Sequence, residues 1–182
     1  MSNFYLICGM SGGGKTVLTD RIVRLNKGLV MLDVDEYYSR INGDDRDRSH
    51  MFEVWHTLFK DIHDFEMQNK DVVLTTNSLT RSQRDQFVEW FPSFDHHCIW
   101  VMAEKERCYE GNCGRHRVVP KDKFEAMWDR MEPPTSVEKL WVSIAYVTNW
   151  WTGEYTTFDV KGNVRSLIDY EKESINNEQK EV

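Results

Sequence analysis

The sequence predicts an α/β fold in which helices cover both faces of a parallel β-sheet. Short apolar runs, typical of buried strands, alternate along the chain with longer segments whose apolar residues recur at helical spacing. A glycine-rich segment, residues 9–16, joins the first apolar run to the first amphipathic segment, as in strand–loop–helix units that bind phosphate. For a chain of 182 residues we expect a single domain, over residues 1–170.

The first half of the chain contains three predicted strands and two predicted helices. The strands are short apolar runs, at residues 4–8, 28–32 and 71–75. The last of these is β-branched and apolar on both faces, so we expect it to be central. Residues 16–25 and 51–67 have apolar side chains at helical spacing and are predicted helices. Residues 42–48 are polar and are predicted to form a loop.

Proline and glycine mark the element boundaries in the second half. Strands are predicted at residues 97–102 and 140–147, and helices at residues 81–91, 105–111 and 121–131. Pro92 ends the first of these helices, a break within residues 111–114 ends the second, and Pro120 begins the third. A small C-terminal β extension is predicted over about residues 148–170, with a turn at Gly162-Asn163.

Composition and charge exclude several classes of protein. The formal net charge of −7 argues against tight, sequence-independent binding to long nucleic acid, which needs lysine and arginine to neutralise phosphates. No apolar stretch is long enough to span a membrane, and the glycine-rich segment begins too early, at residue 9, for a signal sequence to precede it. We therefore expect a cytoplasmic protein with no membrane partner. Residues 171–182 are rich in glutamate, and we expect a disordered tail there.

The segment from Gly9 to Thr16 matches the phosphate-binding pattern G-x-x-x-x-G-K-[ST]. Its glycines let backbone N–H groups converge on a phosphate, and the helix that follows adds a partial positive charge. Lys15 is predicted to bind the β- and γ-phosphates, and the hydroxyl of Thr16 to hold Mg²⁺. The sequence therefore predicts a site for a nucleoside triphosphate, ATP, with Mg²⁺, formed by Gly9, Ser11, Gly12, Gly13, Gly14, Lys15 and Thr16.

Two carboxylates follow the second predicted strand. Ligands of open α/β sheets bind outside the carboxyl ends of the strands, where Asp33 and Asp35 are expected. A carboxylate there can accept the proton of an attacking hydroxyl, and Asp35 is the predicted general base. Asp33 could instead face Mg²⁺ through water. The alternative for both residues is that they cap a helix.

The third predicted strand ends without an acidic residue. Many phosphate-loop NTPases place a magnesium-binding aspartate at this point, where this chain has Thr75-Thr76-Asn77. Metal coordination therefore rests on Thr16 and the carboxylates of the second strand. Thr76 and Asn77 are predicted to hydrogen-bond to substrate or nucleotide, although Asn77 could equally cap the helix that follows.

Residues 107–120 are predicted to form a lid. Arg115 and Arg117 lie close to two glycines, Gly111 and Gly114, which would let the segment move. An arginine that closes over the nucleotide stabilises the charge that spreads over the phosphate oxygens during transfer. The alternative is a solvated basic turn.

Four blocks of the chain, in order over roughly residues 4–147, resemble the polynucleotide kinase family, the phosphate-loop 5′-hydroxyl kinases of phage and of DNA and RNA repair. The blocks are the phosphate-binding loop, residues 32–37, residues 72–77 and the lid. The lid match is the most specific, because Cys108, Asn112 and Arg115 keep the family's spacing. The resemblance implies the P-loop NTPase and kinase fold.

The resemblance also implies roles for single residues. Lys15 and Thr16 would hold ATP·Mg²⁺, Asp35 would be the general base, and Arg115 would be the lid arginine and a contact to ATP. The chain departs from the family at Thr75, where an aspartate is common, and at Gly111, where an arginine commonly precedes the lid asparagine.

The acceptor site shows a third departure. Family members often carry an arginine three residues after the base, where this chain has Tyr38, with Arg40 two positions further on. We expect the acceptor to be bound by Asp33, Tyr38, Arg40, Thr76 and Asn77.

The leading hypothesis is a kinase that transfers the γ-phosphate of ATP to a hydroxyl group, the 5′-OH of a nucleic acid or nucleotide. One alternative keeps the fold but changes the acceptor to a small metabolite or to a hydroxymethylated base in DNA; the acidic charge balance favours the metabolite. Another is a nucleotide-binding regulator without catalysis. Tyr37, Tyr38, Trp55 and Trp90 could stack on bases or could build the interior.

Overall fold

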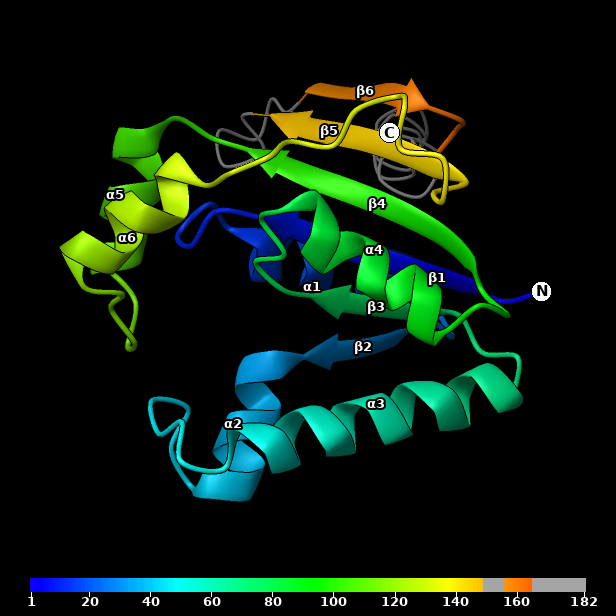
Figure 1. The fold of residues 1–182 in the computed structure, drawn as a ribbon, viewed down its shortest axis with the longest axis horizontal. Coiled ribbons are helices and arrows are strands. Elements are labelled where there is room, and N and C mark those ends of the chain that lie inside the picture. Colours follow the sequence, from blue (N-terminus) through cyan, green and yellow to red (C-terminus); the bar gives the residue numbers. More distant parts are fainter. Residues whose placement is uncertain (149–155, 165–182) are drawn as a thin grey trace, which may run out of the picture.

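The computed structural model describes residues 1–148 and 156–164. Strands and helices alternate along these residues (Figure 1). The strands are β1 (Asn3–Gly9), β2 (Val30–Asp33), β3 (Val72–Thr75), β4 (Asp95–Met102), β5 (Ser143–Thr148) and β6 (Thr156–Lys161). The helices are α1 (Lys15–Leu25), α2 (Val34–Asn42), α3 (Met51–Met67), α4 (Arg81–Trp90), α5 (Lys105–Cys113) and α6 (Lys121–Asp129).

The strands form one sheet in the order β2-β3-β1-β4-β5-β6. The first five strands in this order are parallel, and β6 pairs antiparallel with β5 at the edge. The carboxyl ends of the parallel strands therefore meet along one edge, and α5 and α6 lie beyond that edge (Figure 1). This arrangement confirms the predicted parallel sheet and its small C-terminal β extension.

Helices cover both faces of the sheet. Successive residues of β1 alternate between two separate apolar clusters, because side chains of a strand point to opposite faces. Leu6 packs with Leu58 of α3 and Phe87 of α4 on one face. Ile7 packs with Leu18 of α1 on the other. The predicted two-sided coverage is confirmed, with α4 and α1 on opposite sides of the sheet in Figure 1.

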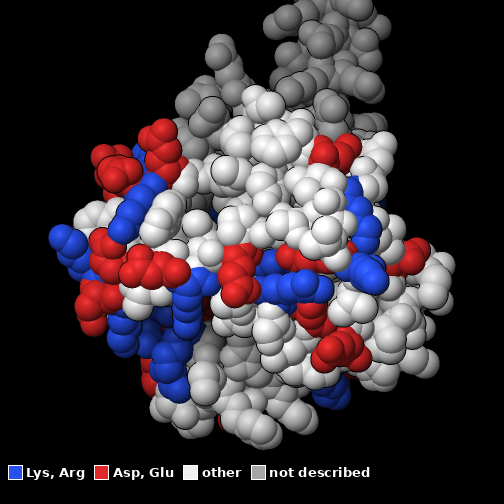
Figure 2. All heavy atoms as spheres, turned by 45° about the horizontal axis from the view of Figure 1, so that its top comes forward, with Lys and Arg blue, Asp and Glu red and all other residues white. Residues whose placement is uncertain are grey.

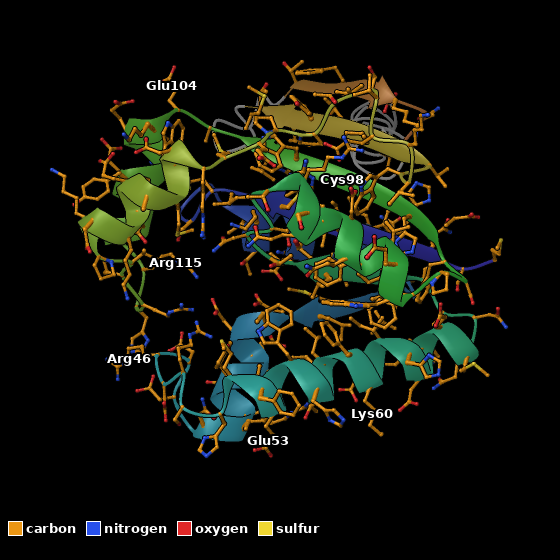
Figure 3. All side chains as sticks on the ribbon, viewed as in Figure 1. Arg46, Glu53, Lys60, Cys98, Glu104 and Arg115 are labelled. Carbon is orange, nitrogen blue, oxygen red and sulfur yellow. The ribbon has the colours of Figure 1, made fainter. Side chains whose placement is uncertain are left out.

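Helix α3 is amphipathic. It buries Val54, Leu58 and Ile62 toward the sheet, while Glu53 and Lys60 lie on its outer side (Figure 3). This division between an apolar and a charged face is typical of a surface helix. Among the described residues, no helix combines the length and apolar character needed to cross a bilayer.

Several boundaries differ from those predicted. Helix α2 lies over residues 34–42, where no element was predicted, because it buries only Tyr37 and Tyr38 and so lacks a long apolar period. The helix break predicted within residues 111–114 comes at the end of that range, since α5 continues to Cys113 and Gly114 is its C-cap. The predicted strand at 140–147 is shifted to β5, and Gly162, at the predicted turn, follows β6 with a φ of 62°. Residues 149–155 and 165–182, with the predicted tail, lie outside the described residues.

Helix α5 lies directly against the glycine-rich loop between β1 and α1. A Cβ added to Gly111 would lie 2.3 Å from the backbone oxygen of Gly12, and one added to Gly12 would lie 2.0 Å from the backbone oxygen of Cys108. Only glycine fits such a close approach of two backbones. Gly111, which the sequence analysis linked to movement of the lid, instead packs the lid helix onto the loop.

We predict that Gly111→Ala lowers the free energy of unfolding by about 1–3 kcal/mol, because the added methyl group meets rigid backbone. Urea denaturation of both proteins measures the difference. Gly114→Ala is the matched control, since its Cβ would have no neighbour closer than 3.8 Å and its φ is −81°. Equal stability of the Gly111→Ala and Gly114→Ala proteins would contradict the close contact between α5 and the loop.

Candidate active site

The glycine-rich loop is shaped to bind an anion. Gly9, Gly12 and Gly14 have φ values of 141°, 77° and 85°, which residues with a Cβ rarely adopt. Helix α1 begins directly after Gly14, so the free N–H groups of its first turn and its dipole face the same side as the loop. The predicted phosphate-binding segment therefore has the backbone geometry that its sequence pattern requires.

Lys15 is buried at the start of α1. Its Nζ donates to the backbone oxygen of Met10 at 2.9 Å and to Oδ1 of Asn77 at 3.0 Å. Burial, together with the positive charge of Arg115, lowers the pKa of Lys15 from 10.5 to about 8. Asn77, expected to contact nucleotide or substrate, thus orients the lysine from the end of β3.

The donor set around Thr16 fits a magnesium ion carried by a triphosphate. Thr16 is exposed on the first turn of α1 and lines the same cleft as Asp33 and Asp35, and oxygen is the ligand that Mg²⁺ prefers. Among the described residues, no three His, Cys, Asp or Glu side chains gather into a metal site of their own. Phosphate oxygens would therefore supply part of the coordination. Thr75 serves another purpose, since its hydroxyl lies 2.7 Å from that of Thr19.

Three arginines surround the carboxylate of Asp35. Arg117 Nη1 donates to Oδ1 at 2.6 Å and Arg48 Nη2 donates to the same oxygen at 3.1 Å. Arg115 Nη2 donates to Oδ2 at 3.1 Å, while its Nη1 donates to Ser11 Oγ in the phosphate-binding loop at 2.9 Å. Arg115 therefore bridges the loop and the predicted base.

Two loops from distant parts of the chain bring these arginines together. Arg48 follows α2, whereas Arg115 and Arg117 follow α5 on the lid. Figure 3 shows Arg115 on the side of the lid that faces α2. Next to it, His116 Nδ1 lies 3.5 Å from Asp45 Oδ1, so the two loops also touch each other.

Asn112 fixes the lid loop. It is fully buried, and its Nδ2 donates to the backbone oxygen of Val119 at 2.9 Å while its Oδ1 accepts from the backbone nitrogen of Val119 at 3.0 Å. Ser11 Oγ donates to the same Oδ1 at 3.3 Å. This asparagine thus closes residues 113–118 into a loop and ties that loop to the phosphate-binding segment.

The two carboxylates of the second strand differ in their surroundings. Asp33 is the N-cap of α2, and its Oδ1 accepts from the backbone nitrogen of Asp35 at 2.9 Å. Burial raises the pKa of Asp33 above its usual value. The capping alternative therefore describes Asp33, while the side chain of Asp35 is directed at the arginines.

One cleft of about 830 Å³ collects most of the predicted site residues. Those that line it are Ser11, Gly12, Gly14, Lys15, Thr16, Asp33, Asp35, Tyr38, Thr76, Asn77 and Arg115. Gly9 and Gly13 shape the loop from outside the lining. Arg40 also lies away from it, since its guanidinium packs on Tyr37 at 4.4 Å and pairs with Asp61 at 3.5 Å.

Two arginines that line the cleft were not among the predicted site residues. Arg48, whose guanidinium lies 3.4 Å from the ring centre of Tyr38, belongs to a polar loop in which no sequence signal distinguishes it from Arg46. Arg117 lies in the predicted lid, but the sequence assigned it no role. Trp55 and Trp90, predicted either to stack on bases or to build the interior, do line the cleft, together with Phe59, which the sequence did not single out.

Comparison with known proteins identifies a family and a fold. A family model described as an AAA domain matches residues 5–134. No curated protein is significantly similar to the chain in sequence.

Solved structures resemble the chain at low identity. A chain of the Pnkp1/Rnl/Hen1 RNA repair complex aligns over 71% of this chain with a TM-score of 0.63 and 13% identity; this chain spans 43% of its length. A sugar kinase from Janibacter sp. HTCC2649 aligns over 93% of this chain and 92% of its own, with a TM-score of 0.60 and 15% identity. Kti12 from Chaetomium thermophilum, solved with ADP-AlF3, aligns over 80% of this chain and 89% of its own, with a TM-score of 0.60 and 11% identity. At these identities the likeness establishes the P-loop kinase fold.

The lowered pKa of Lys15 predicts how binding of ATP depends on pH. Phosphates stabilise the charged lysine, so its pKa is higher in the bound state than the value of about 8 in the free protein. Affinity for ATP should be constant below pH 8 and fall by up to about tenfold per pH unit above it. Titration calorimetry between pH 7 and about 9.5 measures this.

Lys15→Arg provides the control, because a guanidinium stays charged over this range. Its affinity, whatever the absolute value, should not change with pH. A parent protein whose affinity is constant up to pH 9.5 would show that Lys15 does not titrate there.

Proposed function

Because this chain belongs to the AAA domain family and has the P-loop kinase fold, we propose that it is an ATP-dependent kinase whose acceptor is a hydroxyl group, the 5′-OH of a nucleic acid or nucleotide. One observation carries the proposal. Asp35, the proposed base, lines the same cleft as Lys15 and contacts an arginine that also contacts the glycine-rich loop.

The loop and Lys15 bind and orient the triphosphate. Backbone N–H groups of the loop and of the first turn of α1 surround the phosphates, and Lys15 adds a positive charge in a buried setting where charge interactions are strong. Mg²⁺, held by Thr16 and phosphate oxygens, would neutralise charge on the β- and γ-phosphates.

Asp35 and Arg115 act on the transfer itself. The acceptor oxygen forms a bond to the γ-phosphorus, the bond from that phosphorus to the bridging oxygen of ADP breaks, and Asp35 takes the hydroxyl proton. Arg115 lies between the loop and Asp35, where its guanidinium can stabilise charge that develops between donor and acceptor. One of the guanidiniums on Asp35 must move aside for the hydroxyl to approach.

A nucleic acid or nucleotide acceptor is supported by the lid spacing and by the likeness to the repair-complex chain. A small metabolite is the second candidate, because the net charge is −7 and the sugar kinase aligns over nearly the whole chain. ATP consumption and product formation with oligonucleotides, hydroxymethylated DNA and small hydroxyl compounds separate these acceptors. Absence of transfer to any of them, with ATP still bound, would favour a nucleotide-binding regulator.

We predict that Asp35→Asn lowers kcat by about 10²- to 10⁴-fold, because an amide keeps the shape of the side chain but cannot take a proton. The affinity for ATP should not weaken, because the three arginines would lose the carboxylate that they share and would remain available to the phosphates. Steady-state kinetics and calorimetry measure the two effects. Asp33→Asn is the control, because asparagine also caps helices well; a larger loss in that variant would mean that the base is assigned wrongly.

We also predict that Arg115→Ala lowers kcat by about a thousandfold with a modest effect on ATP binding, since the guanidinium acts mainly in the transition state. Arg115→Lys should be impaired too, because only the planar fork reaches Ser11 and Asp35 together. Arg46→Ala is the control, as Arg46 pairs with Asp44 outside the cleft lining. Single-turnover assays compare the variants. If Arg115→Ala transferred phosphate at the parental rate, residues 107–120 would be a solvated basic turn and not a catalytic lid.

A further inference from the structure

A row of three aromatic side chains lines the end of the cleft between α3 and α4. Trp55 and Phe59 come from α3 and Trp90 from α4, and we call this row the aromatic wall. The ring centres of Trp55 and Phe59 are 5.6 Å apart, and those of Phe59 and Trp90 are 4.6 Å apart. The three rings therefore form one continuous apolar surface.

The aromatic wall packs on an aromatic core beneath it but is less buried. Phe4, Phe87 and Phe91 pack together and are at least 96% buried. Trp90 is 48% exposed, although it contacts the core residue Phe87 at its inner edge. One part of the Trp90 side chain therefore packs on the core. The part that lines the cleft is exposed, and a ligand could contact it.

Charge is distributed unevenly along the cleft. Lys15, Arg48, Arg115 and Arg117 all gather around the loop and Asp35. The rings of α3 and α4 are accompanied by a polar group of α4, Gln86, and the cleft is also lined by Arg130, which follows α6. Within residues 1–148 and 156–164, neither of these two side chains makes a hydrogen bond or ion pair.

The surface offers little help for binding a long polyanion. On the face drawn in Figure 2, acidic and basic side chains of the described residues are interspersed and form no continuous basic track. With a net charge of −7, affinity for an acceptor must come from groups inside the cleft more than from neutralising a phosphate chain. An aromatic surface supplies that affinity to a flat ring, because every nucleobase has a face that can stack.

From these observations we infer that the aromatic wall binds the nucleobase of the acceptor's terminal nucleotide by stacking, with the Gln86 amide free to hydrogen-bond to the edge of the base. The inference rests on the proposed kinase function and assigns a substrate class to the acceptor end of its cleft. An amide both donates and accepts, so it suits the mixed donor and acceptor edge of a base. A sugar without a base would leave the aromatic wall uncovered.

The experiment compares two acceptors that differ only in the base. Both are short oligonucleotides with a free 5′-OH, and one has an abasic terminal sugar. With the parent protein, KM for the abasic acceptor should be roughly tenfold higher, equivalent to about 1.4 kcal/mol of stacking. In Trp90→Ala the KM for the normal acceptor should rise to the abasic value, so that the two acceptors become equal.

Two further variants control for folding and for general effects. Trp90→Phe keeps a ring and should preserve most of the preference for the base. Trp128→Phe changes a half-buried tryptophan on α6, outside the cleft lining, and should behave as the parent. KM for ATP should be unchanged in all of them. Calorimetry with each acceptor in the absence of ATP measures binding without transfer.

The outcomes separate the inference from the proposed function. Transfer to both acceptors with equal KM would overturn the role of the aromatic wall and leave the kinase intact. A second outcome is binding that depends on the base and is lost in Trp90→Ala, without any phosphate transfer. That outcome would support the role of the aromatic wall and refute the proposed kinase function. A third outcome is transfer to a small hydroxyl compound, with no binding of nucleotide acceptors and no transfer to them. That outcome would refute binding of a nucleobase by the aromatic wall.

Discussion

The position of the lid depends on the contact between two glycines. Gly12 in the phosphate-binding loop and Gly111 in α5 meet backbone to backbone, at a distance that no side chain could share. Next along the helix, the buried side chain of Asn112 bonds to Ser11 and to both backbone groups of Val119. The lid loop is therefore anchored at both ends beside the phosphate site, and its arginines project over the predicted base. A longer residue at either glycine would move all of them.

The three arginines around Asp35 concentrate positive charge beside the cleft. Three guanidiniums share one carboxylate, and their side chains remain 30–37% exposed. Solvent screens ion pairs that are partly exposed, so a more highly charged anion can compete with Asp35 for these guanidiniums. A triphosphate offers Arg48, Arg115 and Arg117 more negative charge and more oxygen acceptors than one carboxylate does. Binding of nucleotide can therefore draw guanidiniums away and free Asp35 for the acceptor.

The sequence predicted the features that depend on residues close together in the chain. It did not predict the side-chain contacts that form only when distant segments meet in the fold. The strand, loop and helix around Lys15 follow from one local pattern, and the parallel sheet follows from the alternation of apolar runs. The contacts of Asp35 span 13 residues to Arg48 and 82 to Arg117, and no periodicity records which side chain of a polar loop turns inward. Helix α2 was missed for a different reason: it buries only Tyr37 and Tyr38, so its sequence shows no long apolar period, although the cap that Asp33 provides had been considered.

In the proposed kinase, the two ends of the cleft offer the substrates different kinds of interaction. Positive charge gathers at one end, around the buried Lys15 and the lid arginines. At that same end the lid loop touches the loop before α3 through His116 and Asp45. The half-exposed Trp90 marks the other end as the open side. Under the proposal, the base of the acceptor would rest on this aromatic surface while its hydroxyl lies at Asp35, the proposed general base.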